Sequence, residues 1–269
     1  MVDGEYTLVA PMAGGSIMQL EGKTVIVTGG GRGLGRAYSE ALAREGAAVV
    51  AADIRDTAAT VAAIESAGGA AIGLTLDVAD MDSCQAMADR AVAEFGRLDV
   101  LINNAALYGD ISGGRFNLIP EDQWDRVMTV NVKGIWQCCK ACVPAMREGG
   151  GGSIVNISSL AATYGMPYAI DYATSKAAVI GLTRSLAREL GRDWIRVNAV
   201  APSAVLTEGT DEYMGDKRDK ALEVIAAGQS LQSNLETGDM TGTIVYLASD
   251  ASKFVTGQTI MVDGGTVML

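Results

Sequence analysis

Two tyrosine–lysine pairs with the same spacing occur in this sequence. Tyr172 and Lys176 lie in DYATSK, and Tyr213 and Lys217 lie in EYMGDK. On a helix, positions i and i+4 share one face, so a phenol and an ammonium can point into one site. A neighbouring ammonium favours the phenolate and lowers the tyrosine pKa from its usual value near 10. Either pair is therefore a candidate for acid–base catalysis.

The composition restricts the other chemistry that the chain can perform. Its 269 residues include no histidine, which removes the commonest general base and the commonest metal ligand. The formal net charge of −11 disfavours nucleic acid and anionic membranes as partners. Cys139 and Cys142 form a C-x-x-C, which could be a redox pair or half of a zinc site. We interpret them as small apolar residues of a helix and expect no metal.

The first 19 residues are expected to form a loose extension. Asp3 and Glu5 stand where a secretory signal would carry positive charge, and no long apolar run follows them. The four cysteines suggest no disulfide framework, which suits a reducing compartment. We therefore expect a cytoplasmic protein with one domain over residues 20–269.

Short β-branched segments alternate with segments of helical periodicity. Such alternation indicates a parallel sheet with helices on both faces, joined by right-handed crossovers. Strands are predicted at 23–28, 47–52, 70–76, 98–102, 153–157, 195–200 and 258–262, and helices at 33–45, 56–67, 81–95, 121–147 and 172–190. Ligands of such a sheet bind at the carboxyl ends of the strands, so functional residues should follow the strands.

The first predicted strand leads into a glycine-rich turn, TGGGRGLG at 28–35. The spacing G-x-x-x-G-x-G is formed by Gly29, Gly33 and Gly35. Glycines there allow a tight turn and let the backbone approach a pyrophosphate at the helix N-terminus. Asp53 follows the second strand, where it can accept hydrogen bonds from a ribose 2′-hydroxyl and repel a 2′-phosphate. These features favour NAD over NADP, although Arg32 and Arg55 could meet a 2′-phosphate.

In order and spacing, these segments resemble the short-chain dehydrogenase/reductase family. The resemblance runs from about residue 20 to the C-terminus. Its motifs are TGGGRGLG at 28–35, LDV at 76–78, NNAA at 103–106, VNV at 130–132, NISS at 156–159, YATSK at 172–176, NAVAPS at 198–203 and FVTGQTIMVDGG at 254–265. It implies a single-domain Rossmann-type sheet and hydride transfer between an alcohol carbon and nicotinamide. Ala106 and Ser203 depart from the usual glycines, which affects pocket shape more than reaction class.

The resemblance also assigns roles to matching positions. Tyr172 would be the acid–base, Lys176 its partner, Ser159 the catalytic serine, and Asn131 would help to hold a relay water. The cofactor would contact Gly29, Arg32, Gly33, Leu34, Gly35, Asp53, Ile54, Asp77, Val78, Asn104, Ala105, Tyr172, Lys176, Pro202, Val205 and Thr207. Because the Tyr213–Lys217 pair lacks such neighbours, we interpret it as solvated, on a mobile flap at about 207–234.

The predicted substrate pocket is largely apolar. It is expected to comprise Ala106, Leu107, Tyr108, Leu160, Ala161, Met166 and Leu206. With no fixed cation except Lys176, such a pocket suits a neutral ketone or secondary alcohol, with a hydrophobic cyclic or aryl group. A looser resemblance to bacterial secondary-alcohol dehydrogenases agrees with this. Lys217, Arg218 and Lys220 on the flap could still supply charge.

The sequence leaves two alternatives to this function open, and the resemblance also implies an assembly. A 3-oxoacyl carrier-protein reductase is the alternative enzyme, disfavoured by Asp53 and the acidic charge. A nucleotide-binding sensor without catalysis is the alternative class, disfavoured by the intact serine, tyrosine and lysine. The resemblance implies a homotetramer that pairs the helices containing Trp136 and Leu182. The neighbouring apolar residues Val132, Ile135 and Cys139 could equally belong to the core.

Overall fold

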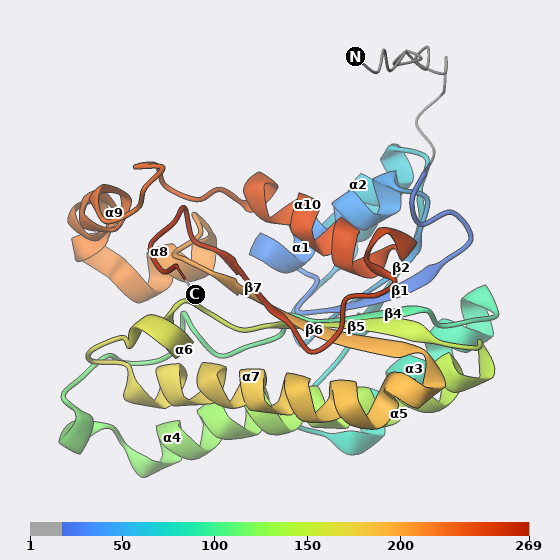
Figure 1. The fold of residues 1–269 in the computed structure, drawn as a ribbon, viewed down its shortest axis with the longest axis horizontal. Coiled ribbons are helices and arrows are strands. Elements are labelled where there is room, and N and C mark those ends of the chain that lie inside the picture. Colours follow the sequence, from blue (N-terminus) through green and yellow to red (C-terminus); the bar gives the residue numbers. More distant parts are fainter. Residues whose placement is uncertain (1–17, 269) are drawn as a thin grey trace, which may run out of the picture.

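Seven parallel strands form one sheet at the centre of the molecule. The computed structural model describes residues 18–268, and its strand order is β3-β2-β1-β4-β5-β6-β7 (Figure 1). The strands are β1 (Thr24–Thr28), β2 (Ala48–Asp53), β3 (Ala70–Thr75), β4 (Val100–Asn103), β5 (Gly152–Ile157), β6 (Ile195–Pro202) and β7 (Thr259–Val262). Strands β2 and β3 are added on one side of β1, and β4 to β7 on its other side. This switch leaves a crevice at the carboxyl ends of β1 and β4. The predicted doubly wound Rossmann-type fold is confirmed.

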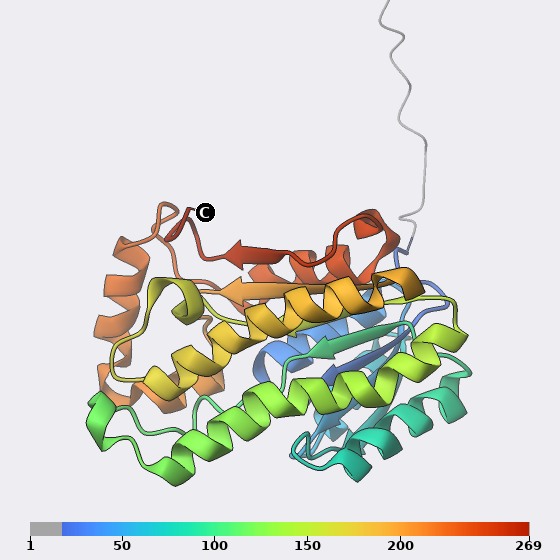
Figure 2. The same ribbon diagram turned by 60° about the horizontal axis from the view of Figure 1, so that its bottom comes forward.

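Helices cover both faces of the sheet because successive strand residues point to opposite faces. Ile26 packs on one face with α3, α5 and α7, whereas Val25 and Val27 pack on the other with α1, α2 and α10. The bounds are α1 (Gly33–Arg44), α2 (Ala58–Ser66), α3 (Met81–Phe95), α5 (Gly134–Glu148), α7 (Ile170–Leu190) and α10 (Thr237–Ala248). Figures 1 and 2 show the two layers, with α5 and α7 running side by side. Cys139 and Cys142 lie buried in the first layer, as predicted for core residues.

Capping residues explain why the observed ends of helix α3 agree with the ends predicted from the sequence. Helix α3 begins after Asp80, whose side chain accepts the Asp82 N–H at 3.0 Å, and it ends at Gly96, which has φ 77°. A side-chain cap at the start and a left-handed glycine at the end are strong helix limits. The predicted helix 81–95 therefore matches α3 at both ends.

The predicted helix at 121–147 is wrong in one respect, because it is interrupted. It consists of α4 (Glu121–Met128), a π turn (Thr129–Lys133, η2) and α5. A π turn inserts one extra residue into a helix and often marks a functional position. Asn131 lies at the centre of this turn and is fully buried.

The flap at about 207–234 contains two helices that the sequence did not predict. They are α8 (Glu208–Met214) and α9 (Arg218–Ala227), separated by a 3-10 turn (Gly215–Lys217, η4). Both lie beyond the carboxyl ends of the strands (Figure 2). Because α8 ends at Met214 and Gly215 has φ 49°, Tyr213 and Lys217 do not share a helix face. Tyr213 and Lys217 therefore do not form an i, i+4 pair, which agrees with the rejection of this pair as a catalytic device.

The remaining elements are short. They are α6 (Ala161–Tyr164) and the 3-10 turns at Phe116–Leu118, Gly191–Asp193 and Asp250–Ser252. Within residues 18–268, no helix combines the length and apolarity that crossing a membrane requires. The N-terminal extension predicted at 1–19 lies almost entirely outside the described residues.

Candidate active site

The carboxyl ends of β1, β2 and β4 border a cavity of about 250 Å³. Of the positions predicted to contact a cofactor, this cavity is lined by Gly29, Arg32, Gly33, Leu34, Gly35, Asp53, Ile54, Asp77, Val78, Asn104, Ala105 and Thr207. The four others, Tyr172, Lys176, Pro202 and Val205, line an adjoining cavity of about 550 Å³. Leu34, Asn104, Ala106, Tyr108 and Thr207 line both. The fold therefore brings all of the predicted cofactor positions to one continuous cleft.

The glycine-rich turn is packed so closely that side chains are excluded. A Cβ on Gly35 would overlap the Gly29 carbonyl oxygen, and Gly29 itself has φ 65°. Asn104 Nδ2 donates to the main-chain oxygens of Thr28 and Gly29 at 3.0 and 3.1 Å. The turn is therefore tied to the loop after β4, and it leads into α1 with the N–H groups of that helix end directed outward.

Thr28 reinforces this link and was not predicted to contribute. Its hydroxyl accepts the N–H groups of both Asn104 and Ala105 at 3.0 Å. A threonine at the end of a buried strand gives no sequence signal of its own, because strands are rich in threonine. Its contribution becomes visible when β1 and β4 lie side by side.

Asp53 is fixed at the end of β2 and almost fully buried. Its two carboxylate oxygens accept the N–H groups of Gly31 at 2.9 Å and Arg55 at 3.0 Å. Each oxygen can accept a further hydrogen bond, and Asp53 lines the cavity, so a pair of hydroxyls there could donate to it. A glycine cradle that a Cβ would fill, a helix N-terminus without a side-chain cap and this carboxylate together fit a dinucleotide.

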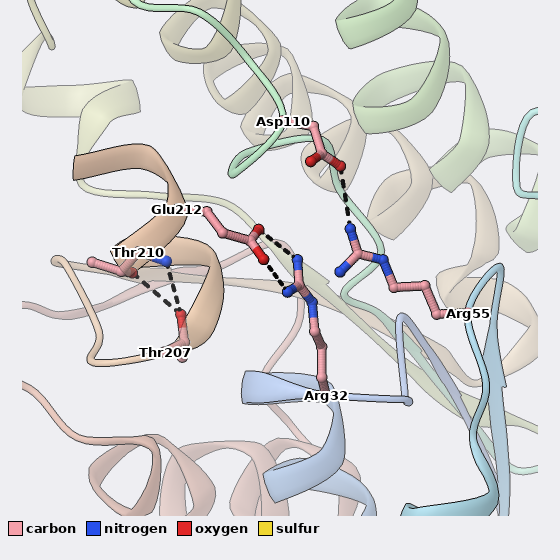
Figure 3. Close-up of polar contacts among 6 residues, drawn as sticks. All are labelled: Arg32, Arg55, Asp110, Thr207, Thr210 and Glu212. Atoms are coloured by element: carbon pink, nitrogen blue, oxygen red, sulfur yellow. Dashed lines mark hydrogen bonds and ion pairs between the residues drawn. The ribbon is translucent and has the colours of Figure 1, made fainter. Parts of the chain in front are cut away.

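Both arginines near Asp53 are paired with acids from across the cavity (Figure 3). Arg32 forms a two-pronged ion pair with Glu212 of α8, with Nη2 2.7 Å from Oε2. Arg55 Nη2 lies 3.3 Å from Oδ2 of Asp110, in the loop after β4. Hydrogen bonding to Arg32 lowers the pKa of Glu212. Residues from four separate segments therefore meet over the nucleotide cavity.

Ser159, Tyr172 and Lys176 meet in the larger cavity, as their order in the sequence predicts. Ser159 follows β5, and Tyr172 lies in the first turn of α7. Lys176 Nζ donates to the Ile157 carbonyl at 2.8 Å and lies 5.7 Å from the centre of the Tyr172 ring. Burial raises the Tyr172 pKa to about 12, and a hydrogen bond with Ser159 opposes the rise.

Burial outweighs the expected lowering of the Tyr172 pKa by Lys176. Burial dominates both groups, and it lowers the Lys176 pKa to about 8 while raising that of the phenol. Desolvation disfavours the charged form of each group, so the phenol stays protonated and the amine is close to neutral at moderately alkaline pH. The phenol is therefore arranged as a proton donor.

Asn131 connects three parts of this site. Its side chain accepts the Leu107 N–H at 2.8 Å and donates to the Leu107 carbonyl at 3.2 Å and the Ser175 hydroxyl at 3.1 Å. Ser175 in turn donates to the Tyr172 carbonyl at 2.7 Å. The amide of Asn131 is thus occupied by protein groups, and it holds the loop after β4 against α7. Ser175 was not singled out from the sequence.

The substrate positions divide between the two cavities. Ala106, Tyr108, Leu160, Ala161 and Met166 line the larger cavity as predicted. Leu107 instead borders the nucleotide cavity. Leu206 is not among the described residues lining either cavity, so its predicted place in the pocket is not supported; its N–H donates to the Leu235 carbonyl at 2.8 Å.

Tyr213 lies at this site, so its interpretation as a solvated residue is wrong. Its ring stacks on Tyr108 with centroids 4.8 Å apart, and Tyr108 lies 5.0 Å from the Tyr172 ring. The three tyrosines form a row from the flap to the catalytic centre. Lys217, the supposed partner of Tyr213, is exposed.

Comparison with known proteins agrees with this geometry. A family model described as enoyl-(acyl carrier protein) reductase matches residues 29–267. A 3-oxoacyl-[acyl-carrier-protein] reductase FabG from Thermotoga maritima is 39% identical over 253 residues, covering 93% of this chain and all of the relative.

Two solved structures share the fold over nearly the whole chain. Carveol dehydrogenase from Mycobacterium avium, in complex with NAD, has a TM-score of 0.87 at 30% identity, covering 92% of this chain and 98% of the other. A putative NAD(P)-dependent gluconate 5-dehydrogenase from Beutenbergia cavernae, with bound NADP, has a TM-score of 0.86 at 36% identity, covering 93% and 98%. With its sheet, its glycine turn and its serine, tyrosine and lysine, this chain belongs to the short-chain dehydrogenase/reductase family.

Proposed function

We propose that this protein is an NAD(H)-dependent oxidoreductase that interconverts a hydrophobic cyclic or aryl secondary alcohol and its ketone. The observation that carries the proposal is the cluster of Ser159, Tyr172 and Lys176 in a largely apolar cavity that adjoins the cavity lined by the glycine turn and Asp53. A bound nicotinamide supplies or accepts the hydride. The protein groups must then orient the substrate oxygen and move one proton.

Tyr172 is the proton donor to the ketone oxygen. With a pKa of about 12, its phenol carries a proton throughout the neutral range. The Ser159 hydroxyl can donate a second hydrogen bond to the same oxygen and so fix its position. Lys176, held by the Ile157 carbonyl, places positive charge beside the phenol and favours the phenolate left after transfer. In the reverse direction, the phenolate accepts the alcohol proton.

Asn131 positions the loop after β4 and the helix α7 that carry this arrangement. Since its side-chain amide binds Leu107 and Ser175, any contribution to a proton relay must use its main-chain carbonyl. The surrounding π turn favours this use, because its wider ring changes the hydrogen bonding of main-chain groups.

The lining of the larger cavity supports a neutral substrate. Among the described residues that line it, Lys176 is the single charged side chain. The flap cations Lys217, Arg218 and Lys220 are not among them, and Arg218 pairs with Asp211 and Asp219. A carboxylate substrate would lack a dedicated cation, whereas Tyr108, Leu160 and Met166 offer an apolar wall.

A matched pair of substrates tests the proposal. Acetophenone and benzoylformate differ in a methyl group against a carboxylate beside the same aryl ketone. With NADH, we expect kcat/KM to be higher for acetophenone, because the carboxylate would lose water without gaining a cation. A clear preference for benzoylformate would contradict the neutral-substrate assignment. Failure of both ketones and of other secondary alcohols would favour a non-catalytic sensor.

A second candidate is 3-oxoacyl carrier-protein reductase. The relatives named for that activity support it, as does a cavity of about 550 Å³ that can accept an acyl chain. Asp53 and the net charge of −11 oppose it, since an acidic carrier would be repelled. Turnover of acetoacetyl-coenzyme A with NADPH in preference to any aryl ketone would establish this alternative.

We further propose that the protein is cytoplasmic and acts as a homotetramer. On α5, Ile135 and Cys139 are buried in the core, whereas the Trp136 side chain is 44% exposed and lies beside Lys140. Interfaces between subunits are enriched in aromatic residues, which supports a role for Trp136 in the proposed assembly. Leu182 on the neighbouring α7 is partly buried.

A further inference from the structure

The two ion pairs that cross the nucleotide cavity are arranged around Asp53. Arg32 directly follows Gly31, whose N–H binds one Asp53 oxygen, and the N–H of Arg55 binds the other. Both arginines therefore start from main chain that is tied to this carboxylate, and both line the same cavity as Asp53. Their partners come from elsewhere: Glu212 from α8 on the flap, and Asp110 from the loop after β4 (Figure 3).

Charge at this end of the cavity depends on these two acids. Without them, two unpaired guanidinium groups and one carboxylate would line this end of the cavity, and their summed charge would be positive. Arginine binds phosphate through paired N–H groups, so free Arg32 and Arg55 would attract a 2′-phosphate and oppose Asp53. With Glu212 and Asp110 in place, carboxylates outnumber guanidiniums and the local charge is negative.

The Arg32 pair is the stronger of the two. Nη1 and Nη2 of Arg32 each contact one Glu212 oxygen, whereas Arg55 makes one contact of 3.3 Å with a more exposed Asp110. A second flap carboxylate, Glu208, also acts on Arg32 by charge. Although exposed ion pairs contribute little to folding, a two-pronged pair does occupy the N–H groups that a phosphate would use.

We propose that Glu212 and Asp110 are specificity-determining residues, which hold Arg32 and Arg55 away from a 2′-phosphate and so maintain the preference for NAD(H). This inference rests on the proposed function, in which Asp53 meets the ribose. It adds that the dinucleotide preference is set by the flap and the β4 loop as well as by the end of β2. Because Glu212 lies on α8, it can pair with Arg32 only while the flap lies over the cleft.

Isosteric neutral substitutions test the inference by direct binding. Affinity for NADH and NADPH would be measured by nucleotide fluorescence on the full chain at low ionic strength. Glu212→Gln should strengthen NADPH binding relative to NADH by about tenfold, the effect of one charge-assisted hydrogen bond to a freed guanidinium. Asp110→Asn should shift the ratio in the same direction by a smaller factor. High salt should reduce both changes.

Two controls separate local pairing from overall charge. Glu223→Gln removes the same charge from an exposed residue of α9 that forms no ion pair within residues 18–268, so the ratio should stay unchanged. Adding Arg32→Gln to Glu212→Gln should cancel the gain, because no guanidinium is then freed. Unchanged unfolding temperatures would show that the variants fold.

The outcomes distinguish this inference from the proposed function. If the unmodified protein prefers NADH and Glu212→Gln leaves the ratio unchanged, the inference is overturned and the proposed function stands. An equal gain in Glu223→Gln would also overturn it. If the unmodified protein prefers NADPH, the assignment of Asp53 is wrong; a further gain in Glu212→Gln would still support the pairing role, and no gain would overturn it.

Discussion

Lys176 should make the stability of the protein rise with pH over a defined range. The side chain is 3% exposed, and burial lowers its pKa from 10.5 to about 8. Between these two values, the unfolded chain holds a proton that the folded chain has released. Stability therefore increases with pH in this range, because the unfolded state binds more protons. Replacing Lys176 with methionine, which has a similar shape and no charge, should remove this contribution.

The drop in the Lys176 pKa sets the size of the effect. A fall from 10.5 to about 8 corresponds to about 3 kcal/mol, at about 1.4 kcal/mol for each pH unit. Integrating from pH 7 to pH 9.5 covers roughly three fifths of this, or about 2 kcal/mol. Over that range, the native protein should gain about 2 kcal/mol of stability relative to Lys176→Met. Ending at pH 9.5 avoids titration of Tyr172, whose pKa is raised to about 12.

Urea unfolding followed by circular dichroism, at fixed protein concentration and several pH values, measures this difference. Other titrating groups are common to both proteins and cancel in the comparison. The absolute stability of Lys176→Met is immaterial, since the argument concerns the change with pH. A difference that stays constant, or that falls as pH rises, would show that Lys176 is not held neutral by burial.

The remaining predictions concern catalysis and assembly. Tyr172→Phe should reduce kcat at least 10²-fold, roughly the contribution of a general acid, while NADH binding measured by fluorescence is retained. Tyr213→Phe should retain kcat because the stacked ring remains; equal losses in both variants would refute the assignment of Tyr172. Light scattering at micromolar concentration should give the mass of a tetramer, and Trp136→Glu should lower it by placing a charge at the interface. A monomeric native protein would exclude the proposed assembly.

Much of the fold could be predicted because its signals are local. The β-branched runs of β1 and β2 and the alternation with helices are sufficient for a parallel sheet. Asp80 and Gly96 mark the ends of α3 unambiguously. The resemblance proposed Ser159, Tyr172 and Lys176 as catalytic residues, and the fold brings them together because Ser159 follows β5 and Tyr172 lies in the first turn of α7.

The flap could not be predicted because its signals are weak or distant. Its segment TDEYMGDKRDK is charged and shows no clear apolar period, so α8 and the start of α9 gave no helical pattern. The lone Gly215 breaks the helix between Tyr213 and Lys217, which spacing alone did not reveal. Arg32 and Glu212 are 180 residues apart, and such a pair becomes apparent once the chain is folded. Burial likewise decides the Tyr172 pKa, and a sequence motif does not report burial.

The π turn at Thr129–Lys133 affects how this segment tolerates insertions and deletions. Each helical residue rotates the chain by about 100°, so one additional residue turns the faces of α5 by about that angle relative to α4. Removing a single residue from the turn would restore one uninterrupted α-helix, but it would swing Asn131 away from Leu107 and release the loop that borders the cleft. A homologue that lacks one residue here must therefore hold the loop after β4 through other contacts. We therefore expect an insertion or deletion in this segment to disturb the site more than a substitution on its exposed face.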